Sequence, residues 1–74
     1  MSEKKGERFR LVICIGDGED TITLTNVTED ELEFYTRSVA LRKWIIVKDW
    51  LGTEHMINPE WISYMYWRLE AEKP

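Results

Sequence analysis

The chain has 74 residues, of which 10 are lysine or arginine and 14 are aspartate or glutamate, so its net charge is −4 at pH 7. A chain of this length forms one domain, with an expected ordered core over residues 8–70, and buries only about 60% of the surface that its unfolded form exposes. The acidic balance argues against non-specific duplex DNA binding through phosphate neutralisation, but it leaves room for a local basic pocket.

The chain has few of the residues that usually stabilise small domains. A single cysteine, Cys14, excludes an internal disulfide, and with the single histidine, His55, it is too few ligands for a structural zinc site. We therefore expect no metal and no cofactor, and association with a second subunit as the remaining means of stabilisation.

The N-terminal MSEKKGER is charged and lacks an apolar run of signal-peptide length. No stretch approaches the roughly 18 apolar residues of a membrane span. The sequence thus predicts a cytoplasmic protein without a membrane partner, in which Cys14 is an ordinary buried thiol.

An alternating segment around Asp17-Gly18 predicts the first hairpin. This pair is a preferred centre for a two-residue turn in which both residues have positive φ. Such a turn places Ile13 opposite Ile22 and Phe9 opposite Asn26. The second face then carries Arg10, Val12, Cys14, Thr21, Thr23 and Thr25.

A helix is predicted over residues 26–43. Thr28 and Glu31 have the spacing of a capping box, and Val27 can pack on Leu32 as a hydrophobic staple. Acidic residues in the first turn and basic residues in the last complement the helix dipole. The expected buried stripe consists of Leu32, Tyr35 and Val39.

The segment KWIIVKDWLGTEHMI predicts a second hairpin with Gly52 in its turn. A two-residue loop places Asp49 opposite Glu54, whereas a three-residue loop closed by a bulge places Asp49 opposite His55 and gives better pairs. In either register Trp50 and Leu51 lie at or beside the tip, where large apolar side chains are unusual.

The stretch WISYMYW, residues 61–67, follows Asn58-Pro59. Asn58 can cap a helix that has Pro59 at its first position, and the apolar residues also have helical spacing. The isoleucine and aromatic content favours a strand from about Trp61 to Leu69 instead. The strand is our prediction, and the helix is the alternative.

The predicted fold is α+β, an antiparallel sheet with one helix packed on one face, in the order ββαβββ. One helix of about four turns cannot cover both faces of a five-stranded sheet. Part of the aromatic surface therefore needs a second subunit or a ligand to cover it.

No pattern of catalytic residues occurs in the sequence. There is no Gly-x-Ser-x-Gly, no paired-histidine metal motif and no phosphate-binding glycine loop before a helix. His55 lies near Lys48, Asp49 and Glu54, so we expect a local ion pair rather than a general base. We expect no enzymatic activity.

The candidate binding residues are the tryptophans, the tyrosines near the C-terminus and the adjacent arginines. Aromatic faces stack on nucleobases while arginine holds phosphate, and the same residue types anchor protein contacts. A core and an oligomer interface would also use them. The set is Trp44, Trp50, Leu51, Trp61, Tyr64, Tyr66, Trp67, Arg68 and Arg42.

The chain resembles small accessory proteins encoded by bacterial viruses and prophages, especially those of Gram-positive hosts. The shared outline is a first strand with a polar turn, an acidic-capped helix, KWIIV and then INPEWISYM. The resemblance implies a virus-encoded product in the host-cell cytoplasm that acts on host machinery or defence by binding. It assigns no functional residue.

The leading hypothesis is a non-enzymatic protein that forms a homodimer or higher oligomer and blocks or sequesters a host component. If the target is a protein, Trp50 and Leu51 are expected to matter most. If it is a nucleotide signal of antiviral defence, held in pockets between subunits, Arg68 or Arg42 is expected to matter most. A structural or RNA-binding small phage protein is a third alternative.

Overall fold

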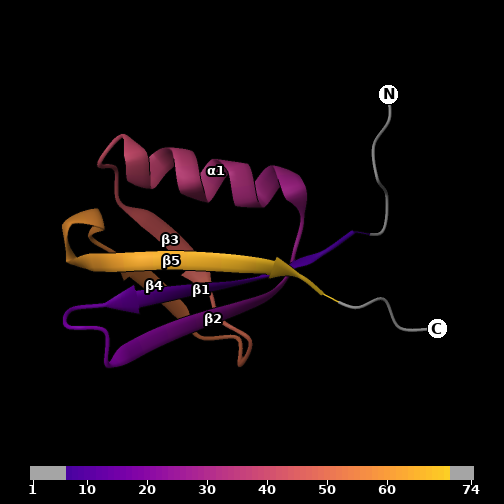
Figure 1. Ribbon diagram of the computed structural model, residues 1–74, viewed down its shortest axis with the longest axis horizontal. Helices are drawn as coiled ribbons and strands as arrows, with labels where there is room; N and C mark the ends of the chain where they lie inside the picture. The colour runs from indigo at the N-terminus through magenta and orange to yellow at the C-terminus, as the bar shows by residue number, and fades with distance from the viewer. Residues whose placement is uncertain (1–6, 71–74) are drawn as a thin grey trace.

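The computed structural model describes residues 7–70, and the order of its elements is the predicted ββαβββ. Figure 1 shows three strands side by side, a helix along one side of them and a hairpin that crosses behind. The elements are β1 (Phe9–Ile15), β2 (Asp20–Val27), α1 (Glu29–Ala40), β3 (Ile45–Lys48), β4 (Glu54–Ile57), the 3-10 turn η1 (Pro59–Trp61) and β5 (Ile62–Leu69).

The strands form two antiparallel sheets rather than the single five-stranded sheet that we expected. One sheet has the strand order β2-β1-β5, and the other pairs β3 with β4. The inner face of the three-stranded sheet, the helix and the β3–β4 hairpin enclose one core (Figure 1). The buried core residues are Leu11, Ile13, Leu24, Val27, Leu32, Ile45, Val47 and Ile57.

The first hairpin has the predicted register up to a bulge. Ile13 lies opposite Ile22 as predicted, but Phe9 lies opposite Val27 rather than Asn26. Asn26 has a φ of 59° and takes up the extra residue of the bulge. In the turn, positive φ falls on Gly16 and Gly18 rather than on Asp17 and Gly18, because glycine alone adopts it without steric cost.

Helix α1 begins with the predicted capping box. The Thr28 hydroxyl accepts a hydrogen bond from the Glu31 N–H at 3.1 Å, and the Glu31 carboxylate accepts one from the Thr28 N–H at 3.0 Å. Val27 and Leu32 both lie in the core, as the staple predicts. Tyr35 and Val39 pack against that core and complete the predicted stripe.

The C-terminus of the helix closes with two backbone hydrogen bonds. The Lys43 N–H donates to the Ser38 carbonyl and the Arg42 N–H donates to the Val39 carbonyl, each at 2.9 Å. This is the Schellman pattern, which places the residue after the C-cap in the left-handed region. Here that residue is Arg42, with a φ of 61°.

The second hairpin has neither of the two predicted registers. Val47 pairs with His55 and Ile45 with Ile57, while the Asp49 N–H donates to the Thr53 carbonyl at 2.9 Å. Trp50, Leu51 and Gly52 therefore form a three-residue loop. Asp49 lies opposite Thr53, rather than opposite Glu54 or His55 as the two predicted registers required. The physical reason is the turn itself: the Gly52 N–H donates to the Asp49 carbonyl at 2.9 Å, and Gly52 has a φ of 89°, the left-handed conformation that closes a three-residue loop. The Asp49 side chain also bonds the loop backbone.

The last segment contains parts of both predicted alternatives. Asn58 caps a short 3-10 turn that has Pro59 at its first position, and its side chain accepts from the Glu60 N–H at 3.0 Å. The chain then extends as the predicted strand, which runs over Ile62–Leu69. A bulge opposite Cys14 and Ile15 turns Ile62 toward the core, instead of placing it beside Tyr64.

Candidate binding surfaces

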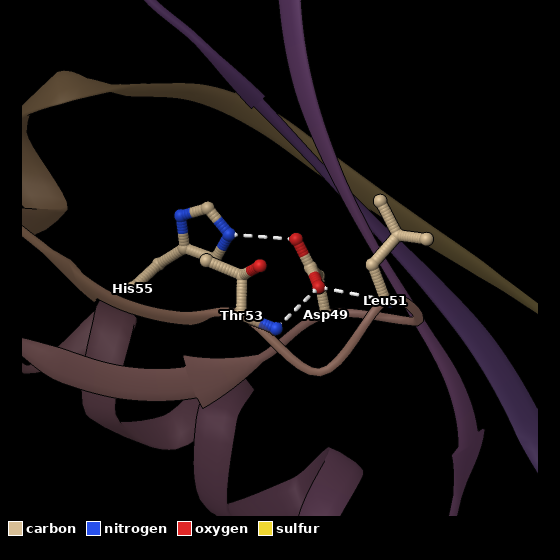
Figure 2. Close-up of polar contacts among 4 residues, drawn as sticks. All are labelled: Asp49, Leu51, Thr53 and His55. Carbon is tan, nitrogen blue, oxygen red and sulfur yellow. Dashed lines mark hydrogen bonds and ion pairs between the residues drawn. The ribbon is translucent and has the colours of Figure 1, made fainter.

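Asp49 organises the turn of the β3–β4 hairpin (Figure 2). Its Oδ1 accepts hydrogen bonds from the N–H groups of Leu51 and Thr53, each at 2.9 Å. Its Oδ2 lies 2.8 Å from Nε2 of His55. One carboxylate thus joins both ends of the loop to strand β4.

These contacts hold the pKa of the Asp49 carboxyl below its ordinary value of 3.8. The hydrogen bond with His55 contributes most, followed by the one from the Thr53 N–H. The local contact predicted for His55 is present, with Asp49 as its partner, and it is an ion pair when the imidazole is protonated. Because the carboxylate contacts only residues of its own hairpin, we assign the pair a structural role in the turn.

The braced turn presents Trp50 and Leu51 to solvent, with 63% and 69% of their surfaces exposed. The Trp50 N–H donates to the Thr23 carbonyl at 3.0 Å, which fastens the tip to the edge strand β2. Two large apolar side chains are thus exposed on a backbone that is fixed on both sides. Such a surface loses little conformational freedom when a partner binds.

The outer face of the three-stranded sheet carries two tyrosines. Tyr64 lies opposite Cys14 and Tyr66 opposite Val12 in the β1–β5 register. The tyrosine rings are stacked, with centroids 6.2 Å apart and planes 20° apart, and each side chain is about half exposed. Cys14 is buried, as predicted for this thiol, and its position beside Tyr64 is the largest cause of the raised pKa of the Tyr64 hydroxyl.

Two arginines follow the tyrosines on the same face. Arg68 of β5 lies directly opposite Arg10 of β1. Arg10 has a partner, because its Nε lies 3.7 Å from the Glu70 carboxylate. Arg68 forms no ion pair within residues 7–70. Along β5 the outer face is therefore aromatic at Tyr64 and Tyr66 and basic at Arg68.

Arg42 lies apart from Arg68. It borders an open hollow together with Val39, Pro59 and Glu60, where its guanidinium is 3.9 Å from the Glu60 carboxylate. The hollow is at the start of β5 and Arg68 is near its end, a separation of about 20 Å along the strand. The two arginines named in the nucleotide hypothesis thus belong to different surfaces.

The other predicted aromatics are dispersed as well. Trp44 precedes β3, and Trp61 is in the 3-10 turn, where its carbonyl accepts from the Gly16 N–H at 2.9 Å. Trp67 lies on the inner side of β5, opposite Leu11. All three side chains are exposed by about half or more. The nine candidate residues therefore form several small surfaces, not one site.

Sequence reasoning missed three features of these surfaces. It did not assign a bracing role to Asp49, and it placed Arg10 on the outer face without pairing it with Arg68. It also missed Ile46 and Met56, which lie opposite each other on the outside of the second hairpin and are 59% and 65% exposed. The correct hairpin register would have revealed this last pair, because it fixes which residues alternate outward.

Within residues 7–70, no three His, Cys, Asp or Glu side chains are grouped so that they could hold a metal ion. No helix in the same range is both long enough and apolar enough to cross a membrane. Comparison with known protein families, with curated proteins and with solved structures finds no match to this chain. The resemblance to phage accessory proteins accordingly stays a prediction.

Proposed function

We propose that this chain is a non-enzymatic binding protein that anchors a protein partner with Trp50 and Leu51 at the tip of the β3–β4 hairpin. The observation that carries the proposal is the Asp49 brace beneath two exposed apolar side chains. Tryptophan is a frequent anchor of protein interfaces, where its truncation often costs about 2 kcal/mol or more.

The proposal includes self-association, supported by apolar side chains that are exposed on more than one face. Ile46 and Met56 form one such pair on β3 and β4, and the tyrosines of β5 form another. A small domain gains stability when a second subunit covers surface of this kind. The resemblance to phage accessory proteins makes a host defence component the expected target, which binding would block or sequester.

The test is affinity capture from a bacterial host extract with the full chain and two variants. Trp50→Ala removes the proposed anchor, whereas Phe34→Ala removes a side chain of similar exposure, 61%, on helix α1. Both residues are exposed, so both variants should unfold at nearly the wild-type denaturant concentration.

We expect a specific protein to be captured by the wild type and by Phe34→Ala, and its recovery to fall at least about tenfold with Trp50→Ala. Equal recovery with Trp50→Ala would contradict the assignment of the tip.

A nucleotide ligand is the second candidate, favoured by the stacked Tyr64 and Tyr66 beside Arg68 and Arg10. Bases stack on aromatic faces and arginine holds phosphate. A ligand at 100 times its dissociation constant would stabilise the fold by about 2.7 kcal/mol. Arg68→Ala should remove this stabilisation and Arg42→Ala should not. If no nucleotide in a broad panel raises the Tm, this candidate is excluded.

A further inference from the structure

The free edge of β5 has backbone groups that are available for pairing. β5 is the last strand in the order β2-β1-β5. The Glu70 N–H donates to the Arg8 carbonyl at 2.8 Å, so Arg68, Tyr66 and Tyr64 also direct their N–H and C=O groups toward β1. By the same alternation, the backbone groups of Met65, Trp67 and Leu69 point away from the sheet.

The two edges of this sheet differ in how they are protected. The β2 edge is interrupted by the bulge at Asn26 and is occupied by the hairpin tip, through the bond from Trp50 to Thr23. From Tyr64 to Leu69 the β5 edge has a regular register and contains no proline, glycine or lysine, and one charge, that of Arg68. Bulges, prolines and lysines are the usual devices that prevent edge pairing, and the stretch from Tyr64 to Leu69 has none of them, since the bulge of β5 lies before Tyr64.

We propose that β5 pairs antiparallel with β5 of a second copy, with Met65 opposite Trp67 of that copy. Each such pair exchanges two backbone hydrogen bonds, and the two-fold axis passes through the facing Tyr66 residues. The result is a continuous six-stranded sheet, β2-β1-β5-β5-β1-β2. The inference deepens the self-association in the proposed function and rests on it, but it does not depend on a partner at the hairpin tip.

Side-chain chemistry selects this register among the possible ones. It places Arg68 opposite Tyr64 of the second copy, where a guanidinium can lie against an aromatic ring. Within its own chain Arg68 faces only the like charge of Arg10. On the inner side, the register brings the Met65 sulfur beside the Trp67 ring of the second copy. A shift of two residues in one direction places Arg68 opposite Ile62, and in the other direction opposite Tyr66. Both shifts remove the contact of Met65 with Trp67.

In the paired dimer, residues of both subunits form the outer face. Tyr64 and Tyr66 of one copy lie between its own β1 and the β5 of the other, and each Tyr64 receives its nearest free arginine from the second copy. A ligand that needs both an aromatic ring and an unpaired guanidinium would therefore contact both chains. This surface and the Trp50 tip are at opposite edges of the sheet, so a variant that prevents β5 pairing leaves the tip unchanged, and a variant of the tip leaves β5 pairing unchanged.

Light scattering on the full chain tests whether the pairing occurs. The wild type should have twice the 8.9 kDa mass of one chain. Trp67→Pro removes an N–H that points away from β1, so it leaves the β1–β5 ladder intact and should raise the dimer dissociation constant at least about tenfold. Trp67→Lys, which adds an edge lysine, should do the same if the proline variant unfolds. A monomeric wild type, or dimers retained by a folded variant, would overturn the proposal.

Cross-linking tests the register in a Cys14→Ser background. Residues on a two-fold axis face themselves, so Tyr66→Cys should form a covalent dimer under mild oxidation. Tyr64→Cys should not cross-link to itself but should cross-link to Arg68→Cys in a mixture of the two variants. Self-cross-linking of Tyr64→Cys as efficient as that of Tyr66→Cys would contradict this register. Trp50→Ala should stay dimeric, which separates this inference from the capture test.

Discussion

Oδ2 of Asp49 and Nε2 of His55 lie 2.8 Å apart and connect the turn of the second hairpin to strand β4. The same carboxylate bonds the backbone of Leu51, directly after the exposed Trp50. The geometry of the proposed anchor therefore depends on one ionised side chain.

The first prediction concerns acid stability. The Asp49 carboxyl has its ordinary pKa of 3.8 when unfolded and a lower pKa when folded. Its contribution to folding is thus complete above 3.8 and is lost as the pH falls through the lower, folded pKa. Urea unfolding between about pH 7 and about pH 2 should show a steeper acid loss for the wild type than for Asp49→Asn. If the free energy of unfolding fell with pH in parallel for the two proteins, the ionised Asp49 carboxylate would not be stabilising the fold.

The second prediction uses the left-handed backbone of Arg42. A residue with a Cβ is strained at a φ of 61°, whereas glycine is not. The Arg42–Glu60 pair is 3.9 Å long and exposed, so its loss costs little. Arg42→Gly should raise the free energy of unfolding by about 0.5–1 kcal/mol. Arg42→Ala, which keeps the Cβ and also removes the ion pair, should give no gain; equal stabilisation by both variants would argue against backbone strain.

The third prediction concerns the start of the helix. Thr28→Ala removes the acceptor of the Glu31 N–H and should lower the free energy of unfolding by about 1 kcal/mol. Thr28→Ser keeps a hydroxyl acceptor and should retain most of the wild-type stability. Denaturant titration followed by circular dichroism measures both, and an equal loss in the two variants would show that the hydroxyl bond is not the cause.

The fourth prediction compares two leucines. Leu24 is 3% exposed in the core, and Leu41 is 59% exposed after the helix. Leu24→Ala should cost about 2–5 kcal/mol, which is enough to unfold much of so small a domain. Leu41→Ala should stay within about 0.5 kcal/mol of the wild type. Similar losses for both would mean that Leu41 is covered in solution, for example by a second subunit.

Local signals in the sequence predicted local structure well. The capping box at Thr28 and Glu31, the first hairpin around Gly18 and the exposure of Trp50 at a tip depend on residues close together in the chain. In each case the physical cause is a short-range bond or a turn preference that the residue types themselves express.

The register of the second hairpin was predicted wrongly, because it was chosen by the pairing of side chains and not by the chemistry of the turn. Gly52, with a φ of 89°, and the Asp49 carboxylate set that turn. The position of Arg68 beside Arg10 could not be predicted from local patterns either, because it depends on the pairing of β5 with β1, which are far apart in the chain. The division into two sheets has the same non-local origin.

Site-specific photo-cross-linking in host cells tests the central claim most directly. A photoreactive phenylalanine analogue placed at Leu51 reports on the hairpin tip, and the same analogue at Phe34 reports on a helix position that is also largely exposed. The proposed function predicts one predominant adduct with a host protein from position 51 that is absent from position 34. The same adducts in the same yields from both positions would contradict a specific contact at the Trp50–Leu51 tip.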